Sequence, residues 1–216
     1  MKRFFGADSP LLKLMTMLLE LAEINLLFLL CSVPVVTAGA AYAAMLHSLY
    51  ELHRYGEGCF SAGSFFRVYK KSLKPLIPAW SIIGVCLVIL GYNISYTLGS
   101  IQGIARIIVC GVYIVLALLI SGMMQYLSFF MALAEKWNPE FIKNSFLLAL
   151  AKFPTVILAS VLSLSVFVVL LFPMSIILRM LPLVILFWCA CPAYVCTGIY
   201  TRVLEPLFPE LFEQDG

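Results

Sequence analysis

The sequence contains little charge. Only 12% of its 216 residues are charged, and 63% are hydrophobic. A soluble globular domain carries about 25% charged residues. A chain this short has too little interior to hide its excess apolar side chains, so part of its surface must face lipid. The net charge of +3 is too small to indicate a nucleic-acid partner. We therefore expect an integral membrane protein that contacts the lipid bilayer and binds no nucleic acid.

Patterns typical of catalytic and metal sites are also lacking. The sequence has no glycine-rich phosphate loop, no HExxH helix and no nucleophile and base in a plausible order. Cys189, Cys191 and Cys196 lie close together, but no histidine or carboxylate accompanies them at ligand spacing, which favours small apolar helix residues over a metal site. We therefore predict no enzyme, no catalytic residue, no metal and no cofactor. An ATP-driven role would need a separate ATPase subunit.

Long uncharged runs are present instead, and each is sufficient for the roughly 20 apolar residues of a membrane-spanning helix. Backbone groups in lipid must be satisfied internally, and no alternating pattern of a barrel is visible, so these runs predict helices. The expected fold class is all-α, a polytopic transmembrane helical bundle with short interfacial helices, and residues 1–216 form a single membrane domain. The runs lie between Lys74 and Arg106, Arg106 and Glu135, Lys152 and Arg179, and Arg179 and Arg202.

The first part of the chain predicts an N-terminal helical hairpin over residues 12–52. Pro34 divides it, because proline disfavours a helical residue before it and fits the first turn of a new helix. Residues 35–52 are either a second span or a re-entrant helix. Glu20 and Glu23 interrupt the preceding apolar stretch, which indicates a retained helix rather than a cleaved signal peptide.

The distribution of positive charge favours six helices at membrane depth, with five spans as the alternative. With six, twelve of the fourteen basic residues fall on one side, and only Arg106 and Arg179 fall on the other. With five, the N-terminus and its basic residues would move outside. The positive-inside rule therefore predicts cytoplasmic N- and C-termini.

Two later segments resemble each other, and each predicts an interfacial helix plus two spans, over residues 60–134 and 138–202. Phe65-Phe66-Arg67 and Phe141-Ile142-Lys143 each precede a proline by ten intervening residues. This similarity indicates either an internal repeat or a chance match in a biased composition. An acidic cytoplasmic tail, residues 203–216, either docks on a partner or rests loosely near the basic loops.

Basic residues in the first of these segments recur on one helical face. Their spacing of i, i+3, i+4 and i+7 makes them candidate interfacial lipid contacts, although ordinary positive-inside anchoring gives the same pattern. The four residues are Arg67, Lys70, Lys71 and Lys74.

Polar residues within the first hairpin form a candidate intramembrane polar cluster of Glu20, Glu23, Asn25 and His47. At 1.5 Å per residue, both glutamates and the histidine lie roughly 16–21 Å from the apex at Pro34. Such residues are costly in lipid and are therefore functional candidates. They either line a polar pathway or form a hydrogen-bonded set that fixes the hairpin. Gln125 lies deep in a predicted span, where its amide is expected to link helices.

The segment Pro34-Val35-Val36-Thr37-Ala38-Gly39, preceded by Asn25-Leu26-Leu27 and followed by Ala41-Tyr42-Ala43-Ala44, resembles the YesL family of bacterial membrane proteins, a domain of unknown function. The resemblance covers about residues 20 to 80. It implies a bacterial plasma-membrane protein, because relatives are often encoded beside carbohydrate ABC-transporter and polysaccharide-utilisation genes. It implies no mechanism and no site residues.

We therefore expect an accessory membrane component linked to carbohydrate uptake or sensing, whose partners are ABC-transporter or sensor proteins. The alternative is a small-solute or ion transporter that uses the intramembrane polar cluster and forms a homodimer. A membrane-embedded enzyme for lipid-linked substrates is a third, less favoured reading.

Overall fold

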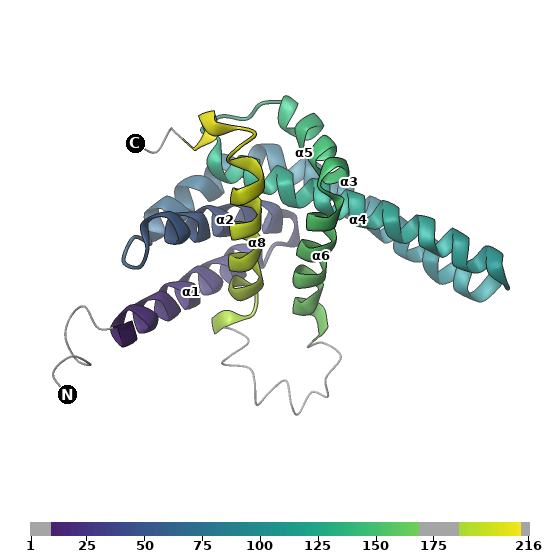
Figure 1. Cartoon of the computed structure of the whole chain (residues 1–216), viewed down its shortest axis with the longest axis horizontal. Helices are drawn as coiled ribbons and strands as arrows, with labels where there is room; N and C mark the ends of the chain where they lie inside the picture. Colours follow the sequence, from purple (N-terminus) through teal and green to yellow (C-terminus); the bar gives the residue numbers. More distant parts are fainter. Residues whose placement is uncertain (1–9, 169–185, 213–216) are drawn as a thin grey trace.

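The chain folds into a bundle of helices, seen in a computed structural model that describes residues 10–168 and 186–212 (Figure 1). No strand occurs in these residues, which confirms the all-α class. The predicted outer loop at Arg179, the N-terminal basic residues and the last acidic residues lie outside the described ranges. The helices are α1 (Pro10–Ser32), η1 (Val35–Thr37), α2 (Ala38–Tyr55), α3 (Ala62–Ser100), α4 (Ile104–Leu133), α5 (Glu140–Ala151), α6 (Phe153–Val168), α8 (Ala190–Leu204) and η3 (Pro209–Leu211).

Three of the described helices are long and apolar enough to cross a membrane, namely α1, α3 and α4. A fourth span results if α5 and α6 are counted together, although a 97° bend separates them. The structure therefore supports a membrane protein with three or four candidate spans. The count of six remains a prediction.

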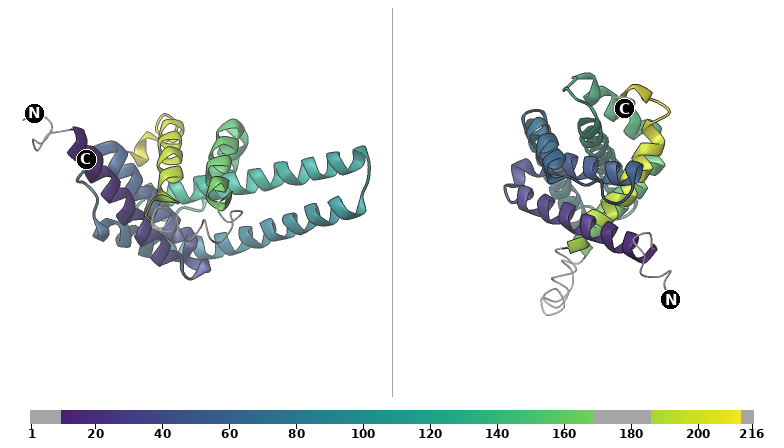
Figure 2. Two further views of the ribbon diagram at one scale, coloured as in Figure 1. Left: turned by 90° about the horizontal axis from the view of Figure 1, so that it is seen from below. Right: turned by 90° about the vertical axis from the view of Figure 1, so that its left-hand side faces the viewer.

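The helix α2 lies at the centre and packs against α1, α3, α4 and α8 (Figures 1 and 2). Its alanines Ala40, Ala41, Ala43 and Ala44 are at most 1% exposed. Small side chains let neighbouring helices approach closely, which explains why the alanine-rich segment is buried in protein rather than exposed to lipid.

The turn at Pro34 follows from local chemistry. Proline cannot continue α1, and the chain enters the short helix η1 directly after it. The Thr37 hydroxyl lies 2.8 Å from the carbonyl oxygens of both Cys31 and Pro34, so it satisfies a free carbonyl at the end of α1. Gly39 then allows Trp80 of α3 to pack directly on the α2 backbone.

The α1–α2 hairpin ends beside the middle of α3. Val35 and Val36 at its apex line a groove together with Trp80 and Ile89. Beyond Ile89, α3 continues to Ser100, about 16 Å farther along its axis. The outer half of the α3–α4 hairpin extends away from the other described helices, as both views show (Figures 1 and 2).

The two similar segments take different conformations. α3 runs without a break from Ala62 to Ser100 and contains Pro75 and Pro78. In the second segment, Lys152 leaves helical geometry with φ −114° and ψ 40°, and Pro154 lies in the first turn of α6, where its missing N–H has no cost. The second segment therefore has a separate helix α5 before its span, whereas the first has one long helix.

The described part of the tail packs on its own chain. The Phe208 ring packs edge-on against Phe130, with centroids 5.2 Å apart, and the Phe212 ring packs against Tyr50 at 5.7 Å. Phe212 is only 4% exposed. The phenylalanines of the acidic tail therefore complete the core beside α2 and α4 as far as residue 212.

Candidate functional site

The carboxylate of Glu20 holds the connection between α2 and α3. Its Oε1 accepts hydrogen bonds from the backbone N–H groups of Gly58 at 2.9 Å and Phe60 at 3.2 Å. Glu20 is 7% exposed, and its Oε2 has no hydrogen-bond partner among the described residues. The first glutamate of the predicted cluster therefore positions a loop.

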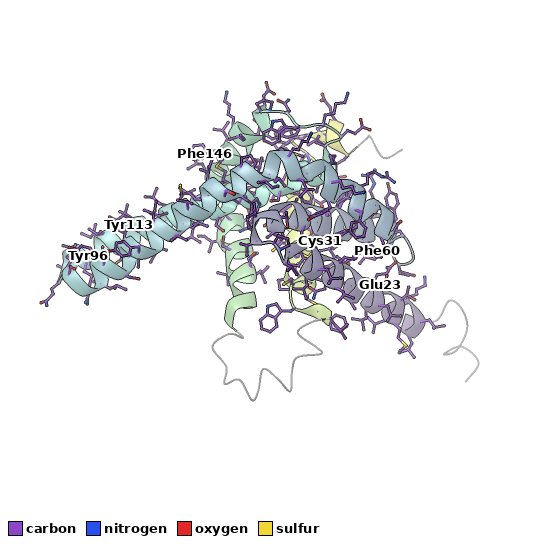
Figure 3. All side chains as sticks on the ribbon, turned by 180° about the vertical axis from the view of Figure 1, so that it is seen from behind. Glu23, Cys31, Phe60, Tyr96, Tyr113 and Phe146 are labelled. Atoms are coloured by element: carbon purple, nitrogen blue, oxygen red, sulfur yellow. The ribbon has the colours of Figure 1, made fainter. Side chains whose placement is uncertain are left out.

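The other ionisable members of the predicted cluster lie apart from this contact. Glu23 is exposed on α1, as Figure 3 shows, and is not buried beside Glu20. His47 approaches Glu51 one turn along α2, with 3.3 Å between Nε2 and Oε1, and the Ser64 hydroxyl donates to the same carboxylate at 3.0 Å. Glu51 was missed from the sequence, although its spacing of i, i+4 from His47 is the pattern that brings two helical side chains together.

Asn25 is fully buried and caps another helix. Its Oδ1 accepts hydrogen bonds from the backbone N–H groups of Cys189 at 3.0 Å and Ala190 at 2.9 Å, at the start of α8. These are the N–H groups that a helix cannot satisfy internally. The predicted cluster therefore divides into a loop contact at Glu20, a contact of His47 with Glu51, a helix cap at Asn25 and the exposed Glu23.

The four residues of the predicted basic face also lie in different surroundings. Arg67, Lys70 and Lys74 are exposed, whereas Lys71 donates to the carbonyl oxygen of Ala134, at the end of α4, at 2.7 Å. The charge of Arg67 also acts on Glu51. Two of the four basic residues thus interact with neighbouring protein groups, while a lipid contact for the exposed ones remains a prediction.

A buried hydrogen-bond network links α4, α6 and α8. Gln125 is 7% exposed, and its Nε2 donates to Ser121 at 3.2 Å and to Ser160 at 3.3 Å. Tyr200 of α8 donates its hydroxyl to Gln125 Oε1. The expected role of Gln125 in linking helices is therefore confirmed.

A cavity of about 280 Å³ adjoins this network. Its polar lining comes from Tyr42, Ser121, Gln125 and Ser163, and its apolar lining includes Trp80 and Leu87. None of the described residues that line it is charged. Residues of four helices, α2, α3, α4 and α6, form the cavity.

The fold and these contacts define a helical membrane protein with a buried, alanine-rich central helix and an uncharged cavity beside it. Residues 21–94 match the family described as protein of unknown function, DUF624, and this match covers the second half of α1, all of α2 and α3 as far as residue 94. The resemblance of the motif-bearing part to a family of unknown function is therefore confirmed, whereas the name YesL stays a prediction. No curated protein and no solved structure matches the chain.

Proposed function

We propose that this chain is an accessory membrane component, without catalytic activity of its own, that acts through contacts with partner proteins. The observation that carries this proposal is the α3–α4 hairpin, whose outer half extends away from the other described helices (Figure 2). Gly91 and Gly99 lie on its exposed surface, with no atom within 4 Å of the place where a Cβ would stand. Glycine weakens a helix but lets another helix approach closely, so these positions suit a partner's membrane helix.

The link to carbohydrate uptake or sensing, and the bacterial plasma membrane as location, rest on the sequence resemblance around Pro34. The proposed partners are accordingly an ABC transporter or a sensor protein. A second copy of this chain is the alternative partner for the same hairpin.

We further propose that the α1–α2 hairpin is re-entrant, so that its two ends lie on the cytoplasmic side with both termini. Its apex beside the middle of α3 supports this reading. Two further observations support it: Lys71 donates to the carbonyl oxygen of Ala134 at the end of α4, and His53 and Arg54 line a surface pocket together with Glu205, which follows α8. Labelling of single introduced cysteines with an impermeant maleimide tests it, since a residue beside Pro34 that reacts from outside would contradict the re-entrant path.

The main proposal is tested by purifying the tagged full-length chain from native membranes after mild extraction and cross-linking. We expect a transporter or sensor subunit to co-purify in fixed proportion. Gly91→Leu should reduce that recovery several-fold, because the new side chain blocks close approach. Val112→Leu on the exposed surface of α4 is the control, since it changes neither polarity nor close packing. Recovery of the chain alone would contradict the proposal.

A small-solute or ion transporter is the second candidate function. It is favoured by one observation: Glu20 Oε2 and His47 Nδ1 are buried and have no hydrogen-bond partner among the described residues. Flux measured in proteoliposomes tests it, with Glu20→Gln as the variant that keeps the loop contact but removes the charge. Flux that is absent in the parent, or unchanged in the variant, would exclude a role for this carboxylate.

A further inference from the structure

One face of α1 carries a row of exposed apolar side chains that a single carboxylate interrupts. The row consists of Met15, Leu19, Glu23, Leu26 and Leu30. Its members are three or four residues apart, a spacing that places them within about 80° of one another around the helix axis. Each apolar member is at least 44% exposed, and Glu23 is exposed in their midst, as Figure 3 shows. The row therefore lies on the surface of the described protein over about 22 Å of helix.

Neither lipid nor water suits the whole row. The helix α1 is one of the candidate membrane spans, and an ionised carboxylate such as that of Glu23 is costly in lipid. In water the carboxylate is satisfied, but the apolar side chains on both sides of it form an exposed patch of the kind that marks an interaction site. A protein surface that is apolar along its length and offers a positive charge opposite Glu23 satisfies both kinds of residue.

The described part of the chain supplies no such charge. The Glu23 carboxylate takes part in no ion pair or hydrogen bond with a described residue. Lys13 lies ten residues earlier on α1, about 15 Å along the helix, and pairs with Glu57 at 3.5 Å. Glu20, one turn before Glu23, faces the loop at Gly58 instead. The complement of the row must therefore come from another molecule.

A second copy of this chain does not provide the complement. Two α1 rows that meet about a two-fold axis would bring Glu23 against Glu23, and like charges oppose such a contact. Arg106 is exposed between Ile104 and Ile107 at the start of α4, but it follows the outer end of α3. Glu20 ties α1 to the opposite end of α3, about 57 Å away along its axis. Copies with the same orientation in one membrane therefore place Arg106 and Glu23 at different depths.

We propose that the α1 row binds a helix of a different membrane protein, one that carries apolar residues at the same three- and four-residue spacing and a lysine or arginine opposite Glu23. The apolar side chains of the two helices interdigitate, and the charge pair fixes their register, as a polar residue in an apolar seam does. A lipid headgroup would pair with Glu23 without using the spacing of the apolar residues. The row is separate from the outer half of the α3–α4 hairpin, so this proposal does not depend on the contact proposed there.

A synthetic helix in a phosphatidylcholine bilayer tests the proposal. The probe is a leucine–alanine peptide of about 22 residues, long enough to cross the bilayer, with one lysine and an acceptor dye. A series of peptides moves the lysine one turn at a time, so that one of them matches the depth of Glu23. Energy transfer from a donor dye on the full-length chain measures binding. We expect saturable binding that depends on the position of the lysine.

Variants at Glu23 separate the charge pair from apolar contact. Glu23→Gln should weaken binding of the lysine peptide about five- to tenfold. Glu23→Lys should abolish it and should instead bind a peptide with glutamate in place of the lysine. Because Glu23 is exposed and has no partner among the described residues, both variants should fold like the parent protein, which circular dichroism checks.

Two further variants serve as controls. Glu57→Gln removes a carboxylate that pairs with Lys13 away from the row, so it should leave peptide binding unchanged. Gly91→Leu should also leave it unchanged, even though recovery of a partner from native membranes should fall; the two surfaces can therefore fail independently.

Three results would overturn the proposal. Equal binding of peptides with lysine, glutamate or leucine at the variable position would show that Glu23 selects no charge. Displacement of the lysine peptide by phosphatidylethanolamine would assign Glu23 to a lipid headgroup. Energy transfer between two labelled copies of the chain that excludes the peptide would assign the row to a homodimer.

Discussion

Replacing Gly39 with alanine tests the packing of α2 on α3. A Cβ at this position would lie 2.1–2.4 Å from three ring atoms of Trp80, whereas ordinary contact begins at 3.4 Å. Either the indole or the helix must move to relieve this overlap. Overpacking of a buried site costs about 1–3 kcal/mol, and the better helix propensity of alanine recovers up to about 1 kcal/mol. We therefore expect Gly39→Ala to destabilise the protein by about 1–2 kcal/mol.

Reversible unfolding in mixed micelles, followed by circular dichroism over increasing SDS, measures this free energy. Gly91→Ala is the matched control, because nothing lies within 4 Å of its Cβ position and the substitution should stabilise α3 by up to about 1 kcal/mol. The double variant with Trp80→Leu removes the ring and should recover most of the loss that Gly39→Ala causes. Equal stability of Gly39→Ala and the parent protein would refute the close approach of α2 and α3.

Three further predictions follow from the polar contacts. Asn25→Ala removes the cap of α8 and should cost about 1–2 kcal/mol, with faster hydrogen exchange at the first amides of that helix and little change in the α4 amides. Glu20→Leu should release residues 56–61 to limited proteolysis, whereas Glu20→Gln keeps the acceptor oxygen and should not; equal cleavage of both would count against the loop contact. Burial raises the pKa of the Cys59 thiol, and the negative charges of Glu20 and Glu51 raise it further. Less thiolate is therefore present at neutral pH. In a variant that keeps Cys59 and has the other six cysteines replaced, alkylation should be slow, and its pH profile should shift to lower pH when Glu51→Gln is added; an unshifted profile would contradict this cause.

Local chemistry made part of this fold predictable. Proline at position 34 ends one helix and permits another, and a polar amide in a long apolar run such as Gln125 must find a partner inside the protein. The long uncharged runs predicted an all-α membrane protein, because backbone N–H and C=O groups in lipid must pair within the protein. These inferences depend only on a residue and its immediate surroundings.

The rest of the site depends on rotation about helix axes and on contacts between distant segments. Counting residues from Pro34 gives the depth of Glu20 and His47 but not the direction in which each side chain points. His47 consequently pairs with Glu51 on its own helix. Asn25 caps α8, whose first residues come more than 160 positions later, and no local pattern indicates that contact. Trp80 was not singled out either, since its importance comes from Gly39 opposite it.

The burial of α2 has a consequence for how the protein is made. This helix is not among those long and apolar enough to enter a membrane alone, yet it packs against α3, α4 and α8, all of which are synthesised after it. Its packing therefore depends on helices that leave the ribosome later, and α8 is the last of these. A nascent chain that stops before Ala190 would leave the side of α2 that packs against α8 uncovered, so its first hairpin should be less stable than in the full-length protein.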